Sequence, residues 1–110
     1  MKPVYLTQSQ LKNVLDNIPT SEHLNIALCS VPTIQINGIT CYESRMAAEA
    51  LSKYYRGRAA ENWKKDHREP LYMKTSYYAG IAEVWLAKAR AIEQIMLKWE
   101  AQDEDHQTVL

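Results

Sequence analysis

Soft metal ligands are few in this sequence and lie far apart. They are His23, Cys29, Cys41, His67 and His106. No two of them have a CxxC or HxxxH spacing, the arrangement that brings zinc ligands together on one turn or one helix face. The two cysteines fit better as small apolar side chains of the interior. We therefore expect neither a metal nor another cofactor.

Signatures of nucleophilic and acid–base catalysis are equally scarce. No serine lies in a Gly-x-Ser-x-Gly segment, and neither cysteine has a local histidine partner. The three glycines are too dispersed to form a phosphate-binding loop. Paired carboxylates occur only in the acidic end of the chain, where they repel one another and stay solvated. A site assembled from remote residues stays open, but an enzyme is the least favoured class and we expect no catalytic residues.

Charge is balanced over the chain but uneven along it. Thirteen Lys and Arg match thirteen Asp and Glu in 110 residues, so the whole-chain charge favours neither nucleic acid nor an acidic membrane. Residues 45–74 carry an excess of cations, and residues 75–110 carry an excess of acids. The sequence has no apolar run of signal-peptide or membrane-spanning length. We expect a cytoplasmic protein that does not bind membranes.

The spacing of apolar residues predicts a single α+β domain over residues 1–102, mainly helical. Residues 7–18 have apolar side chains at helical intervals, and Pro19 ends this first helix. Residues 21–30 are compatible with a strand or with a helix. We favour a strand, which would extend the sheet to a three-stranded meander.

Residues 33–42 carry the clearest local signal. Two alternating runs flank Asn37-Gly38, the preferred pair for a two-residue type I′ turn, so the segment predicts a β-hairpin. An isolated hairpin is marginally stable in water, and we expect its apolar face to pack on the helices. That face comprises Ile34, Ile36, Ile39 and Cys41, whereas Gln35 and Thr40 pair on the opposite, wetter face.

A long antiparallel helical hairpin is predicted for residues 45–68 and 73–100, with the break at Glu69-Pro70. Ser44 is the expected N-cap of the first of these helices. Gly57 in its interior costs about 1 kcal/mol relative to alanine, which suggests close packing against a neighbour or a bend. The buried stripe of this helix recurs every four residues: Ala47, Leu51, Tyr55, Ala59 and Trp63.

The last predicted helix, residues 73–100, has apolar side chains on two sides. Leu86 and Leu97 fall on its polar face, and the acidic segment 103–110 is expected to fray. Surplus apolar surface of this kind indicates a binding partner. The expected core face comprises Tyr78, Ile81, Trp85, Ala89, Ile92, Met96 and Trp99, with Val84 and Ile95 beside it.

These patterns favour a non-enzymatic protein–protein interaction module that binds a larger protein and inhibits or adapts it. We expect the contact at the outer face of residues 73–100, with charge and shape contributed by residues 45–68 and by the turn at Pro70. The candidate partner-binding residues are Leu86, Leu97, Arg90, Glu93, Arg56, Arg58, Pro70 and Tyr72.

Two alternatives stay open. Residues 45–68 interleave cations with Tyr54, Tyr55 and Trp63, a mixture that would suit a small nucleic-acid-binding protein. Residues 73–100 would instead support a homodimer if their surplus apolar surface pairs with itself.

In architecture the chain resembles the small accessory proteins of enterobacterial phages and plasmids. Like them it combines an amino-terminal helix and hairpin with a long helical pair, here residues 45–65 and 73–100. Phage inhibitors of host recombination nucleases and of other defence machinery are similar in size and in this helical hairpin. The resemblance implies an inhibitor or adaptor of a larger host complex, including one that processes nucleic acid, and assigns no residue.

Overall fold

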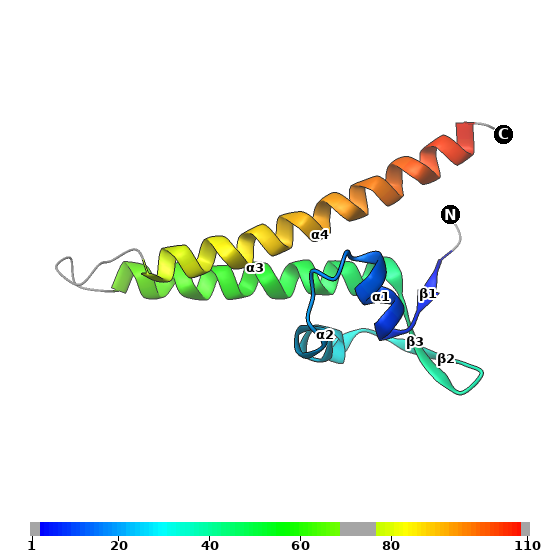
Figure 1. Ribbon diagram of the computed structural model, residues 1–110, viewed down its shortest axis with the longest axis horizontal. Helices are drawn as coiled ribbons and strands as arrows, with labels where there is room; N and C mark the ends of the chain where they lie inside the picture. The colour runs from blue at the N-terminus through cyan, green and yellow to red at the C-terminus, as the bar shows by residue number, and fades with distance from the viewer. Residues whose placement is uncertain (1–2, 69–76, 109–110) are drawn as a thin grey trace.

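The computed structural model describes residues 3–68 and 77–108, with the side chains of residues 3–66 and 77–102. The fold is α+β and mainly helical, as the sequence predicts (Figure 1). Two long helices form an extended arm, and the short elements gather beside one end of it. In chain order the elements are β1 (Tyr5–Leu6), α1 (Gln8–Val14), α2 (Ser21–Ala27), the 3-10 helix η1 (Leu28–Ser30), β2 (Thr33–Ile36), β3 (Ile39–Glu43), α3 (Ser44–Arg68) and α4 (Tyr77–Thr108).

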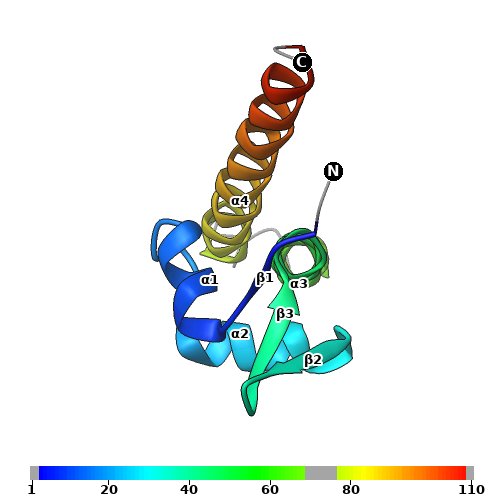
Figure 2. The same cartoon turned by 90° about the vertical axis from the view of Figure 1, so that its right-hand side faces the viewer.

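The arm is the predicted helical hairpin. Helices α3 and α4 lie closest near the end of α3 and separate towards the end of α4 (Figures 1 and 2). Helix α4 has 32 residues against 25 in α3. The acidic residues that we expected to fray continue α4 as helix to Thr108, so this helix ends later than predicted.

Residues 21–30 are helical, and the prediction of a strand there is wrong. The Thr20 hydroxyl accepts a hydrogen bond from the backbone N–H of His23 at 3.1 Å and so caps α2. Leu24, Ala27 and Leu28 then lie on one buried face, which is the helical alternative of the sequence pattern. The local spacing of apolar residues fits a strand and a helix equally well, and packing on the rest of the domain therefore selects the helix.

The hairpin has the predicted turn and register. Asn37 and Gly38 both have positive φ, 52° and 77°, as a type I′ turn requires. Cα partners are Ile34 with Cys41, Gln35 with Thr40 and Ile36 with Ile39, and the Gln35 amide donates to the Thr40 hydroxyl at 2.8 Å. The third strand of the described sheet is β1, which pairs with β3 and gives the order β1-β3-β2 instead of a meander.

The core lies where α1, α2 and the first half of α3 meet the middle of α4. The predicted stripe of α3 is confirmed for four members, and Trp63 is partly buried. Val84 is exposed, so its placement beside the core is wrong. The buried cluster comprises Leu11, Leu15, Leu24, Ala27, Leu28, Ala47, Ala48, Leu51, Tyr55, Ala89, Ile92 and Ile95.

Two local predictions for α3 need correction. The Glu43 carboxylate accepts a hydrogen bond from the backbone N–H of Met46 at 2.8 Å, so Glu43 caps the helix in place of Ser44, which is buried. A Cβ built on Gly57 meets no atom within 4 Å, so close packing does not explain this glycine.

Candidate protein-binding surface

Four of the predicted partner-binding residues line one flank of α4. Leu86, Arg90, Glu93 and Leu97 are spaced by four, three and four residues, which places them on one face of the helix. Leu97 is exposed, as predicted, whereas Leu86 is partly buried. The uncovered apolar surface of this flank is therefore centred on Leu97.

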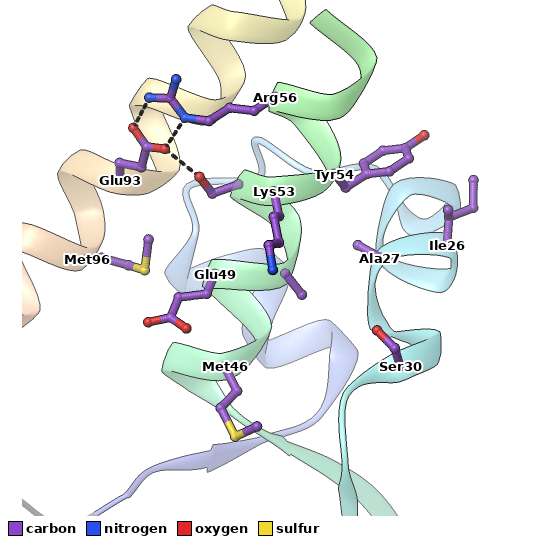
Figure 3. A pocket seen from close by; sticks show the side chains of 12 residues that line it. Ile26, Ala27, Ser30, Met46, Glu49, Lys53, Tyr54, Arg56, Glu93 and Met96 are labelled. Carbon is purple, nitrogen blue, oxygen red and sulfur yellow. Dashed lines mark hydrogen bonds and ion pairs between the residues drawn. The ribbon is translucent and has the colours of Figure 1, made fainter. Parts of the chain in front are cut away.

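An open groove of about 780 Å³ lies next to this flank. Figure 3 shows it from close by: α3 forms its floor, and α2 and α4 form its walls. Its apolar lining includes Ile26 and Met46, both exposed large side chains. The full lining is Ile26, Ala27, Ser30, Met46, Glu49, Ala50, Ser52, Lys53, Tyr54, Arg56, Glu93 and Met96.

An ion pair joins α3 to α4 at the groove. Arg56 donates from Nε to Oε2 of Glu93 at 2.7 Å and from Nη2 to Oε1 at 2.6 Å (Figure 3). The Ser52 hydroxyl also donates to Oε2, at 2.5 Å. These contacts fix the spacing of the two helices, because a two-pronged guanidinium–carboxylate pair constrains both distance and orientation.

The electrostatics of this pair follow from the same contacts. The hydrogen bond from Arg56 lowers the pKa of Glu93 to about 2, against the opposing effect of desolvation and with help from Ser52. The hydrogen bond to Glu93 raises the pKa of Arg56. The charges of these two predicted binding residues therefore neutralise each other, and Arg56 and Glu93 contribute mainly to the shape of the groove.

The remaining predicted residues are not all brought to the groove. Arg58 pairs with Glu61 at 3.2 Å, and its guanidinium lies 5.4 Å from the ring centre of Trp85. It is absent from the groove lining. Pro70 and Tyr72 fall outside the described residues.

The side chains that would serve nucleic-acid binding are largely engaged within the chain. Tyr55 is buried, and Tyr54 packs at its side with ring centres 5.6 Å apart. Arg56 and Arg58 pair with acids, and the Lys65 ammonium lies 5.7 Å from the ring centre of Tyr78. Buried rings cannot stack on bases, so none of these contacts favours the nucleic-acid alternative, which stays a prediction.

Sequence reasoning missed an aromatic cluster that joins α2 to both long helices. The rings of His23, Tyr54, Tyr55 and Trp85 have centres 5.2 to 6.1 Å apart. Nδ1 of His23 lies 3.1 Å from the Tyr55 hydroxyl. His23 reaches the cluster from α2, within the segment for which we predicted a strand, so that prediction concealed the cluster.

Burial governs the titration of this cluster. It lowers the pKa of His23, as do the charges of Lys88 and Arg58, while Glu22 opposes them. Burial also raises the pKa of Tyr55 to about 12. Both shifts favour the neutral form of the side chain, which suits a cluster that packs between three helices.

The β-hairpin leaves most of its apolar face uncovered. Ile34, Ile36 and Ile39 are 38%, 43% and 55% exposed, and only Cys41 of that face is buried. The expectation that the helices cover this face is wrong, because the hairpin projects away from them (Figures 1 and 2). The surrounding sequence is unusual in charge as well: residues 23–42 contain no Asp, Glu, Lys or Arg.

Within the described residues, no group of three or more His, Cys, Asp or Glu side chains is placed to hold a metal ion. Both cysteines are free, and Cys29 is exposed, which corrects the expectation that both are interior. None of the helices described here combines the length and the apolarity that crossing a membrane requires.

Comparisons with protein-family models, with curated proteins and with solved structures found no match for this chain.

Proposed function

We propose that this chain is a non-enzymatic interaction protein that binds a larger protein through the groove and the adjoining flank of α4. The observation that carries the proposal is the exposure of large apolar side chains in and next to the groove, Ile26 and Met46 within it and Leu97 beside it. Exposed apolar side chains gathered in this way are typical of protein-binding sites.

The composition of the groove supports the same function. Its apolar side chains come with Glu49 and Lys53 of α3, which lie between Met96 on one side and Ile26 on the other (Figure 3). Protein interfaces commonly combine apolar side chains with polar and charged ones. Met46 and Met96 add flexible, polarizable surface, which adapts well to the shape of a partner.

The geometry favours a helix as the bound element. A groove floored by one helix and walled by two others offers ridges and furrows that an amphipathic helix can fill. The role as inhibitor or adaptor of a host complex, encoded by a phage or mobile element, is supported only by the resemblance in architecture.

Affinity capture from the source cell, followed by mass spectrometry, tests this function. The wild-type chain should recover a defined partner, and Leu97→Lys and Met46→Lys should each lose it, because both place a charge in the contact. Val84→Lys is the matched control, since Val84 is 59% exposed and Leu97 54%, on different flanks of α4. Equal recovery by all four proteins would refute the proposed surface.

A further inference from the structure

The outer edge of β2 is open to a further strand. Strand β2 lies at one end of the order β1-β3-β2, and no strand of the described chain pairs with its other side. In a hairpin closed by a two-residue turn, Ile36 and Ile39 form the hydrogen-bonded pair next to the turn. Hydrogen-bonded and non-hydrogen-bonded pairs then alternate, which turns the backbone N–H and C=O groups of Thr33 and Gln35 outwards.

Residues 33–36 lack the side chains that usually protect an edge against pairing, and the proline of this segment, Pro32, lies just before the strand. Many natural edge strands carry a lysine, a proline or a bulge that blocks another strand. Residues 33–36 contain neither lysine nor proline, pair with β3 without a bulge, and are all exposed. The outward backbone groups are therefore accessible to a second polypeptide.

The sequence of β2 is complementary to itself. In an antiparallel pairing of two copies about a two-fold axis at Ile34, Thr33 lies opposite Gln35 of the partner subunit, and Ile34 lies opposite Ile34 of the partner subunit. Polar residues meet polar ones and apolar residues meet apolar ones, with about four backbone hydrogen bonds formed at the edge.

Charge favours a second copy in the same way. A two-fold axis brings residues close to the axis near the same residues of the second copy, so a charged side chain there would repel the identical charge of the other copy. The uncharged run 23–42 contains the whole hairpin up to Tyr42, in a chain with 24% charged residues. The exposed isoleucines of the two hairpins would form one continuous apolar face.

We propose that two copies of this chain associate through their β2 strands into a continuous antiparallel sheet. The proposal is independent of the partner-binding groove and uses a different surface. It also differs from a dimer through residues 73–100, because the contact is made by strands and not by α4.

Analytical ultracentrifugation of the full chain, in a dilution series up to about 1 mM, measures this association. The high concentration is needed because two four-residue strands make a small interface, and small interfaces bind weakly. The wild-type chain should show a monomer–dimer equilibrium. Ile34→Lys places two ammonium groups opposite each other and should raise the dimer Kd about tenfold or more. Ile39→Lys is the control, because Ile39 shares the apolar face but lies on the central strand.

A mixing experiment separates the edge contact from a loss of folding. Ile34→Lys and Ile34→Glu should each be monomeric alone and should form a mixed dimer together, because opposite charges then face each other. Circular dichroism confirms that each variant is folded. The proposal is overturned by a wild-type chain that stays monomeric, by an Ile39→Lys variant that dissociates as readily as Ile34→Lys, or by variants that fail to form the mixed dimer.

Discussion

Replacing Glu93 with glutamine should loosen the attachment of α4 to α3. The carboxylate accepts two hydrogen bonds from Arg56 and one from Ser52, all between 2.5 and 2.7 Å. A fall in the pKa of Glu93 from 4.5 to about 2 corresponds to about 3 kcal/mol of stabilising free energy before solvent screening is taken into account. The side chains are 50% exposed at Arg56 and 31% at Glu93, and solvent screening reduces the expected loss to about 1 kcal/mol.

The stabilising contribution of Glu93 should decrease in acid. The pKa of Glu93 is lower in the folded chain than in the unfolded chain, so its stabilising contribution is complete above about pH 4.5 and is lost as the pH falls towards 2. Urea unfolding of the wild-type chain and of Glu93→Gln, at pH 7 and at several values below 4.5, should show two curves that converge in acid.

Two further variants make the result specific. Arg56→Gln should destabilise the wild-type chain but add little to Glu93→Gln, because the partner is already absent. Glu61→Gln removes an exposed pair within α3 and should change the free energy of unfolding by less than about 0.5 kcal/mol. Equal stability of Glu93→Gln and wild type at pH 7, with parallel pH profiles, would contradict a stabilising role for the Arg56–Glu93 pair.

Three other predictions concern stability and titration. Gly57→Ala should raise the free energy of unfolding by about 0.5 to 1 kcal/mol in urea melts, because an added Cβ meets nothing within 4 Å; a lower midpoint would contradict this. Titration of His23 by NMR should give a midpoint below 6.5. Because the pKa of His23 is lower in the folded chain than in the unfolded chain, the free energy of unfolding should fall as the pH drops below 6.5. Lys88→Met should raise the midpoint of His23, and an unchanged midpoint in this variant would exclude the effect of Lys88. Leu97→Lys should alter stability by less than about 0.5 kcal/mol, whereas Leu86→Lys should cost more than about 1 kcal/mol, because only Leu86 is partly buried; equal thermal melts would contradict that difference.

Features with a purely local cause were predictable from the sequence. Asn37-Gly38 fixes a type I′ turn through its own backbone preferences, and the register of the hairpin follows from the turn. The buried stripe of α3 likewise follows from helical spacing alone. In both elements the local pattern and the packing of the domain favour the same structure.

Features decided by distant contacts were not predictable. The apolar spacing of residues 21–30 suits two structures, and packing on α3 selects the helix. Strand β1 is only two residues long and pairs with β3 across nearly forty residues, so no period in the sequence reveals it. Tyr5 and Leu6 are extended because the tertiary fold brings them beside β3.

The candidate site shows the same division. The alignment of Arg90, Glu93 and Leu97 on one flank follows from helical angles. The pairing of Glu93 with Arg56 depends on the distance between two helices, and the partial burial of Leu86 depends on what lies against α4. The groove itself involves three helices and has no signature in the sequence.

Binding of a partner protein at the groove and the Leu97 flank can be measured by titration calorimetry of the captured partner with the wild-type chain, Leu97→Lys and Val84→Lys. Leu97→Lys should weaken binding about tenfold or more, whereas Val84→Lys should bind as the wild type does. Equal affinity of Leu97→Lys and wild type, or equal loss in both variants, would contradict binding at this surface.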